Sequence, residues 1–368
     1  MKFFPEPILV TRPYLPDLEE FKRGCEEIWN NRWLTNDGPV LGRFHRRLAE
    51  YLDVPETNLA IFSNGTLALE LGYYAMGLSG GEVVTTPFTF VATSHALVRA
   101  GAKPVFADVD PETLCLDPAK AERLVRPGVT KAIVPVHVYG HVCDTAGFAR
   151  LSEKYGIPVI YDAAHAFGVR GIEKNGAMSM FSFHPTKLFH SCEGGCLVFR
   201  DAALQEKLFN LRNFAITSET ECVDVGSNAK MNELQALMGL KCLEKIDDIL
   251  AWRRRVYEAY VEVFGPRSGS SKVTLLPHSA NHAYVPVLFR TNELREKAYR
   301  ELAEKCNVFV RRYFYPALPG FAPYAYARGT CPIAEEASSR ILTLPTYFGL
   351  PPEDARAIAE NVLEIVQG

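Results

Sequence analysis

The amino-acid sequence predicts an α/β protein with a mostly parallel sheet in a large N-terminal domain, followed by a smaller C-terminal α/β domain. Short β-rich runs alternate with helical patterns between about residues 58 and 200, and most of these runs are apolar on both faces. Strands of this kind are typical of a parallel sheet that is covered by helices. The composition then changes at GPRSGSSK, residues 265–272, which we interpret as a linker or exposed turn. With 368 residues and 48% hydrophobic content, the chain is long enough for two domains.

The large domain is predicted from strands that alternate with helices. The helical patterns include TLALELGYYAMG (66–77) and TAGFARLSEKYG (145–156), and the second ends on a glycine, as helices often do. Because ligands of such a sheet bind beyond the carboxyl ends of its strands, the residues after each strand are the candidates for a site. The predicted strands are 59–63 (LAIFS), 82–87 (EVVTTP), 103–109 (KPVFADV), 131–138 (KAIVPVHV), 157–162 (IPVIYD), 179–184 (SMFSFH) and 195–199 (GCLVF).

The C-terminal part has a different pattern. A long helical stretch covers residues 232–264, and after the composition change come one strand at 282–290 (HAYVPVLFR) and an amphipathic helix at 292–305. A segment rich in proline and tyrosine precedes a closing helix. We therefore predict a large domain of residues 1–249, with an N-terminal substrate segment, and a small domain of residues 250–368.

Charge, hydropathy and cysteine content exclude several classes. The net charge is −3 and no block of five like charges occurs, so neither a nucleic acid nor an anionic membrane is an expected partner. No run approaches the ~20 apolar residues that span a bilayer, and Pro5, Pro7, Pro13 and Pro16 interrupt the start where a signal peptide would be apolar. We expect a cytoplasmic protein. The nine cysteines show no CxxC or metal-type spacing, so we expect free, mostly buried thiols and no metal site.

Four strand ends carry polar or otherwise distinctive residues, found in SNGT (63–66), PFTFVAT (87–93), YDAAHAFG (161–168) and SFHPTK (182–187). Each has an ordinary alternative: a helix cap at Gly65, a cap or turn at Asp162, and a solvated surface charge at Lys187. Together they supply an anion cradle at a helix start, an aromatic ring, a carboxylate and an amine. These are the parts of a pyridoxal 5′-phosphate (PLP) site, where a lysine holds the cofactor and a carboxylate keeps its ring nitrogen protonated.

The same motifs resemble a known family. SFHPTK followed by EGG, together with YDAAHAFG, SNGTLAL, PFTFVAT, PVHVYG and GSNAKMNELQALMGL, resembles the DegT-type nucleotide-sugar aminotransferases, which have the PLP fold type I architecture. The resemblance runs in order from WLTNDGP (33–39) to RRYFYP (311–316). It implies PLP as cofactor, a nucleotide sugar and L-glutamate as substrates, and a homodimer with shared active sites.

The resemblance also implies roles for residues around the cofactor ring. Lys187 matches the lysine that forms the Schiff base, and Asp162 matches the partner of the pyridinium nitrogen. His165, where many relatives have Gln, would approach the 3′-oxygen of the ring. Phe90 matches the aromatic residue that stacks on one face, and Ala164 is small enough to let the ring lie against the other.

Other matches concern the phosphate and the substrate. Gly65, Thr66 and Ser182 match phosphate-binding positions, and Asn228 matches a residue that reaches the phosphate from the neighbouring subunit. Lys230 stands where many relatives carry Arg. His137 and His190, like His184, are either acid-base groups or structural imidazoles, and the pair Arg311–Arg312 either meets a diphosphate or faces solvent. The candidates for contacts with the substrate are His184, Lys230, Arg311, Arg312 and Tyr313.

The retained lysine distinguishes the possible activities. Members of the wider family that dehydrate sugars replace this lysine by His, so Lys187 favours transamination. A PLP-binding scaffold without activity would be expected to lose the lysine or the carboxylate, and the chain has both. The motifs look most like the subgroup that aminates C4 of dTDP-4-keto-6-deoxyglucose, and the alternatives are a 3-keto nucleotide sugar or a keto-inositol.

Overall fold

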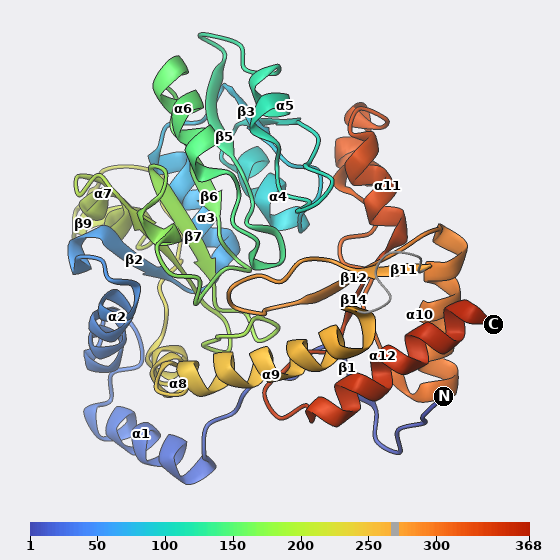
Figure 1. Cartoon of the computed structure of the whole chain (residues 1–368). Helices are drawn as coiled ribbons and strands as arrows, with labels where there is room; N and C mark the ends of the chain where they lie inside the picture. Colours follow the sequence, from blue (N-terminus) through green and yellow to red (C-terminus); the bar gives the residue numbers. More distant parts are fainter. Residues whose placement is uncertain (266–271) are drawn as a thin grey trace.

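The computed structural model describes residues 1–265 and 272–368. Figure 1 shows a large α/β part around a central sheet and a second part formed mainly by α9, α10, α12 and the strands β11, β12 and β14. Both chain ends lie in the second part (Figure 1). Most of the expected linker at 265–272 lies outside the described residues.

The central sheet contains the seven predicted strands. Isolated parallel bridges from Ile133 to Val159 and from Val136 to Asp162 join a four-stranded and a three-stranded ladder edge to edge. Of these seven strands, β8 runs in the opposite direction to the other six, so the expectation of a mostly parallel sheet is confirmed. The strand order is β2 (Leu59–Phe62), β8 (Gly195–Phe199), β7 (Met178–Ser182), β6 (Ile160–Asp162), β5 (Thr130–Val134), β3 (Glu82–Thr85) and β4 (Lys103–Phe106).

Helices cover both faces of this sheet because successive residues of a strand point to opposite sides. In β2, Leu59 and Ile61 join one hydrophobic cluster, and Ala60 and Phe62 join another. The helices of this part are α1 (Leu18–Asn31), α2 (Pro39–Leu52), α3 (Gly65–Ala75), α4 (Val91–Arg99), α5 (Pro118–Glu122), α6 (Thr145–Tyr155), α7 (Leu204–Leu211) and α8 (Glu233–Leu243).

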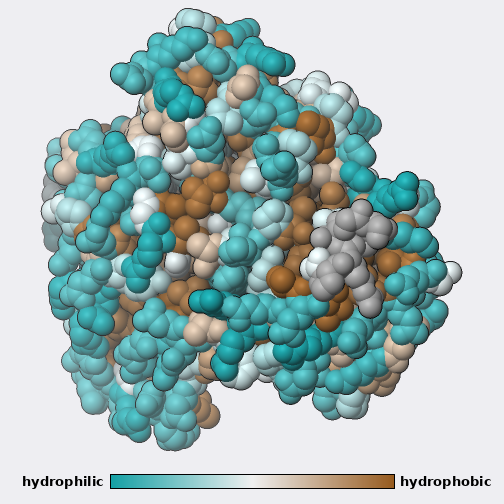
Figure 2. Space-filling model, in the orientation of Figure 1, coloured by the Kyte–Doolittle hydropathy of each residue, from teal (hydrophilic) through white to brown (hydrophobic). Residues whose placement is uncertain are grey.

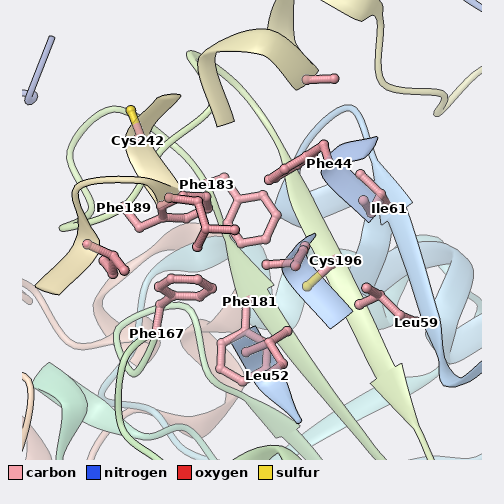
Figure 3. Close-up of a cluster of buried hydrophobic side chains, with 14 of the residues drawn as sticks. Phe44, Leu52, Leu59, Ile61, Phe167, Phe181, Phe183, Phe189, Cys196 and Cys242 are labelled. Carbon is pink, nitrogen blue, oxygen red and sulfur yellow. The ribbon is translucent and has the colours of Figure 1, made fainter. Parts of the chain in front are cut away.

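An aromatic cluster lies directly behind the segment that carries Lys187. The rings of Phe167 and Phe189 stack with centroids 4.3 Å apart, and Phe183 meets Phe189 edge-on at 4.9 Å. Phe183 and Phe189 are fully buried, and Figure 3 shows them packed with Phe44 and Phe181. Anchoring the chain on both sides of Lys187 in one core restricts the positions that the lysine backbone can take.

The second part has its own antiparallel sheet and helices. Strand β12 (Val285–Phe289) lies between β11 (Val273–Leu275) and β14 (Ile341–Leu344). Near the N-terminus, β1 (Ile8–Leu9) pairs in parallel with β13 (Val308–Phe309), so the first residues pack with this part. The helices are α9 (Ile246–Phe264), α10 (Asn292–Cys306), α11 (Pro332–Arg340) and α12 (Pro352–Gln367).

Two expectations for the C-terminal half were wrong in detail. The long helix expected over 232–264 is interrupted, because Lys245 has φ −112° and ψ 8° between α8 and α9. This break lets Leu243 and Ile246 both enter the core of the large part before α9 continues into the second core. The sequence also predicted one strand beyond residue 272, whereas β11 and β14 flank it. The proposed division near residue 250 falls within α9.

Polar and apolar residues are distributed unevenly over the face shown in Figure 2. In the view of Figure 2, hydrophilic residues cover the outer parts of the molecule, and hydrophobic residues gather toward the middle of the face. Among the described residues, no helix has the length and apolar character needed to cross a membrane. All nine cysteines are free, and six of them are buried, as expected.

Candidate active site

A cleft of about 280 Å³ opens at the carboxyl ends of the strands β6 and β7. The arrangement agrees with the rule that ligands of such sheets bind at this edge. Most of the predicted site residues therefore meet in one place. Those that line the cleft are Gly65, Thr66, Phe90, Asp162, Ala164, His165, Ser182, His184, Lys187, Arg311 and Tyr313.

Asp162 ends β6 at the base of the cleft and is 3% exposed. Its Oδ2 accepts a hydrogen bond from Thr93 Oγ1 at 2.7 Å, and its Oδ1 accepts one from the Ala164 N–H at 3.0 Å. Burial raises the pKa of Asp162, whereas these two donors and the nearby Lys187 charge oppose the rise. A cationic partner in the cleft would favour the ionised carboxylate further.

His165 is held as a neutral ring with a defined tautomer. Burial, with the Lys187 charge adding to it, lowers the pKa of His165 well below its ordinary value. Its Nδ1 accepts a hydrogen bond from the Tyr139 N–H at 3.1 Å, so the ring proton must be on Nε2. That nitrogen lies 3.3 Å from the Tyr313 hydroxyl and is the donor that a ligand oxygen in the cleft would meet.

Lys187 lies on a loop that closes on itself after β7. The Phe183 N–H donates to Gly194 O at 2.8 Å, and the Ser191 N–H donates back to Phe183 O at 3.1 Å. The amine Nζ is 3.4 Å from the Tyr284 hydroxyl of the second part of the molecule. The loop therefore holds the backbone of the lysine, and its side chain lines the cleft with the amine next to Tyr284.

The start of α3 forms an anion cradle. The Leu67 N–H donates to the capping side chain of Asn64 and the Ala68 N–H to the Asn64 carbonyl, which leaves the N–H groups of Gly65 and Thr66 for a ligand. A Cβ at Gly65 would lie 3.3 Å from Ser182 Oγ, so glycine leaves room between the helix start and this hydroxyl. A Cβ at Gly195 would lie 2.7 Å from Gly65 Cα, which explains why the first residue of β8 is a glycine.

The two walls beside Asp162 fit a flat ring. Phe90 is 54% exposed although it is a large aromatic residue, and it lines one side of the cleft. Ala164 lies two residues after Asp162 and presents only a methyl group. An exposed aromatic face at a cleft wall is available for stacking.

The outer wall of the cleft is polar and more exposed. His184 Nε2 is 3.6 Å from the Glu193 carboxylate, and its Nδ1 accepts a bond from the Thr186 N–H at 3.2 Å. Arg311 lies over the Tyr313 ring, with 5.7 Å between the guanidinium carbon and the ring centroid. Within the described part of the chain, Arg311 has no carboxylate within ion-pair distance.

Three predicted residues lie away from this cleft. Asn228 bridges to Asn213, and Lys230 Nζ donates to Asn213 Oδ1 at 2.5 Å, next to the hairpin of β9 (Ile216–Ser218) and β10 (Glu221–Cys222). Arg312 pairs with Glu296 and packs 3.7 Å over the Tyr299 ring. Arg312 therefore lies outside this cleft, because successive side chains of an extended segment point to opposite sides, and its contact with the substrate stays a prediction.

The two further histidines have structural partners. His137 is fully buried, stacks on Tyr161 at 4.8 Å, and accepts a bond from the Cys143 N–H at 3.1 Å. Burial lowers the pKa of His137 to about 3. His190 Nε2 lies 2.6 Å from Tyr14 O. These contacts favour the structural interpretation of both.

The structure adds residues that the sequence reasoning did not single out. Thr93 contacts Asp162, and Thr89 contacts Thr93. Both belong to the PFTFVAT motif: Thr93 lies in the first turn of α4, and Thr89 directly precedes the N-cap residue of that helix. Glu193 stands in the EGG motif and reaches the cleft. For Tyr284, which directly precedes β12 and is distant in the sequence from Lys187, the sequence offers no local signal.

The chain is similar to known proteins over nearly its whole length. The chain is 40% identical over 371 residues to the dTDP-4-amino-4,6-dideoxy-D-glucose transaminase of Shigella dysenteriae, covering 98% of this chain and 99% of that protein. It is 35% identical to the Escherichia coli protein of the same name, covering 97% and 98%. A solved structure of DesI in the presence of its TDP-sugar product superposes with a TM-score of 0.90 at 32% identity, covering 100% of this chain and 94% of that chain. A family model matches residues 17–363, and the chain thus belongs to the DegT/DnrJ/EryC1/StrS aminotransferase family.

Proposed function

We propose that this chain is a PLP-dependent transaminase that moves an amino group from L-glutamate to C4 of dTDP-4-keto-6-deoxyglucose. The observation that carries the proposal is the convergence of Lys187, Asp162 and the amides of Gly65 and Thr66 in one cleft. The two relatives named as dTDP-4-amino-4,6-dideoxy-D-glucose transaminases support this acceptor, since the similarity covers nearly the whole of each chain.

The residues of the cleft fit the cofactor. Gly65, Thr66 and Ser182 would hold its phosphate, and Phe90 and Ala164 would hold the two faces of its ring. When bound, PLP supplies an electron sink that stabilises negative charge on the carbon that loses a proton. Asp162 would carry the charge that keeps the ring nitrogen protonated, and the His165 Nε2–H would donate to the ring oxygen.

Lys187 would perform the proton transfers. Its amine would hold the cofactor until the amino donor displaces it, and would then take a proton from the substrate carbon and deliver it to the cofactor carbon that had carried the lysine. General acid-base transfer of this kind contributes about 10²–10⁴-fold. The Tyr284 hydroxyl, 3.4 Å from Nζ, would orient the amine during these steps.

The outer wall would bind the charged ends of the two substrates. Arg311 is the candidate for the diphosphate of the nucleotide sugar, because it lines the cleft without a carboxylate partner among the described residues. His184 and Tyr313 lie next to it. A 3-keto nucleotide sugar or a keto-inositol is the second candidate acceptor, since phosphate recognition by Arg311 does not select the keto carbon.

We further propose a homodimer with shared active sites. The β9–β10 hairpin and its flanks expose Phe214, Ile216, Val223 and Val225, the last at 80%. Asn228 pairs with Asn213 at the base of this hairpin, and the Lys230 amine lies 5.2 Å from the Phe214 ring centroid. A second copy of the chain on this apolar surface would both cover it and bring Asn228 and Lys230 to the partner's cofactor phosphate and substrate.

The test of the activity is a co-substrate screen. The purified chain, loaded with PLP, is incubated with L-glutamate and a panel of 3-keto and 4-keto nucleotide sugars, and the products are identified by mass and by NMR. Formation of dTDP-4-amino-4,6-dideoxyglucose at the highest kcat/KM supports the proposal. A preference for a 3-keto sugar or a keto-inositol would replace it with the second candidate, and absence of any visible cofactor band would contradict a PLP enzyme.

The test of the dimer mixes two inactive variants. A Lys187→Ala chain and an Asn228→Ala chain, after demonstrated subunit exchange, should recover part of the activity, because one site in each mixed dimer has both residues intact. No recovery would contradict a shared site.

The division into domains 1–249 and 250–368 and a cytoplasmic location stay predictions from the sequence.

A further inference from the structure

We infer that Thr89 and Thr93 form a directed hydroxyl chain that holds the Asp162 carboxylate ionised and oriented, and so act as positioning residues for the proposed transamination. This inference rests on the proposed function. It concerns residues that do not carry out the chemistry themselves, and it follows from the hydrogen bonds beneath the cleft.

The direction of the chain is determined by counting hydrogens. Thr93 Oγ1 lies 2.7 Å from Asp162 Oδ2 and 2.8 Å from Thr89 Oγ1. An ionised carboxylate only accepts, so the single Thr93 hydroxyl hydrogen is directed to Asp162, and Thr89 must then donate to Thr93. Protonation of Asp162 would allow the opposite direction, so the order Thr89→Thr93→Asp162 belongs to the ionised state.

The location of the chain makes it effective. Thr93 is fully buried and Thr89 is 3% exposed, so water does not replace these donors. Hydrogen bonds to a charged group are strong in such surroundings, and polarised chains strengthen each other. Without the Thr93 donor, the buried Asp162 would lose one of the two hydrogen bonds that stabilise its charge.

The carboxylate is also held in its plane. Thr93 bonds Oδ2 and the Ala164 N–H bonds Oδ1, while the Asp162 N–H donates to Pro135 O at 2.9 Å. The ionisable groups that act on this carboxylate from neighbouring elements are Tyr73 on α3 and Lys187 after β7. Burial raises the pKa of Tyr73, and its buried hydroxyl has no hydrogen-bond partner within the described residues, whereas the Thr93 hydroxyl is bonded to the carboxylate.

The experiment compares Thr93→Val, which removes the hydroxyl, with Thr93→Ser, which restores it. The matched control is Thr85→Val, because Thr85 is fully buried on β3 and donates one bond, to Val134 O at 2.8 Å, away from Asp162. Three properties are measured on each PLP-loaded protein: the pH titration of the visible cofactor band, the dissociation constant for PLP, and kcat and KM for both substrates.

We expect Thr93→Val to lower kcat about tenfold, the lower limit for loss of a bond to a charged group, with each KM within about twofold. The midpoint of the visible-band titration should move to higher pH. When the ring nitrogen of the cofactor carries less positive charge, the Lys187 nitrogen that holds the cofactor is easier to protonate, so its pKa rises. Thr93→Ser and Thr85→Val should both titrate like the wild type.

Several results would overturn the inference: an unchanged titration in Thr93→Val, the same displacement in Thr85→Val, or no rescue by Thr93→Ser. If Thr93→Val does not fold, Thr89→Val is the substitute test, since it weakens the hydroxyl chain while leaving the bond from Thr93 to Asp162. A smaller shift of the titration midpoint to higher pH supports the hydroxyl chain, and an unchanged midpoint contradicts it. The titration needs only bound cofactor, so a wild type that titrates but does not aminate a sugar contradicts the proposed function alone.

Discussion

The inner and outer halves of the cleft are built in different ways. In the inner half, Asp162, His165 and Ser182 are buried, and a Cβ at Gly65 would lie 3.3 Å from Ser182 Oγ. In the outer half, the side chains of His184 and Glu193 are 46% and 53% exposed at a separation of 3.6 Å. Exposed pairs of this kind contribute little binding free energy on their own. The comparison teaches that buried hydrogen bonds hold the groups around Asp162 in place, whereas the exposed pair in the outer half is held less firmly.

The strongest test of the inner half is Lys187→Ala. Because the amine would perform the covalent and proton-transfer steps of the proposed reaction, we expect kcat to fall on the order of 10⁴-fold or to background. The side chain is partly exposed, so the melting temperature should change little. Steady-state assays and thermal unfolding measure the two effects, and activity near that of the wild type would contradict the assignment.

Asp162→Asn should give the next largest effect, a fall in kcat of about 10²-fold with the cofactor retained. The amide keeps the size of the side chain but no longer carries the charge that holds the ring nitrogen protonated. Absorbance after gel filtration reports the bound cofactor, and kinetics report the rate. An unchanged rate would show that Asp162 does not partner the ring.

Gly195→Ala probes the close packing of the inner half. The added Cβ would approach Gly65 Cα to 2.7 Å and displace the start of α3. We expect a loss of about 1–3 kcal/mol of unfolding free energy and weaker PLP binding. Gly42→Ala is the control, because a Cβ there would meet only Arg46 Nη1 at 3.8 Å, and alanine favours a helix interior. Equal effects of both substitutions would contradict the role of the close contact.

Arg311→Ala should give the smallest effect, in the outer half. We expect KM for the nucleotide sugar to rise about tenfold with little change in cofactor affinity, since a hydrogen bond to a charged group contributes roughly 1.5–3 kcal/mol. Arg312→Ala is the matched control, because its guanidinium pairs with Glu296 outside the cleft. If both variants raise KM equally, the distinction between the two arginines is wrong.

The sequence alone determined the sheet, the position of the cofactor half and the family. Apolar runs gave the seven strands, and the residues after them gave Lys187, Asp162 and the Gly65–Thr66 cradle, because each motif joins a strand end to the next turn or helix within a few residues. Local patterns of this kind depend on backbone sterics and side-chain period, which neighbouring residues decide.

Only the tertiary structure decided the contacts between distant segments. It placed Thr93 on Asp162 and Tyr284 beside Lys187, paired β1 with β13, and interrupted the helix at Lys245. It also separated two adjacent arginines, since the backbone of Arg311 pairs with Thr343 and directs that side chain to the cleft while Arg312 faces Glu296. Such choices depend on how complete elements pack against one another, and residues far apart in the chain carry no local pattern that specifies them.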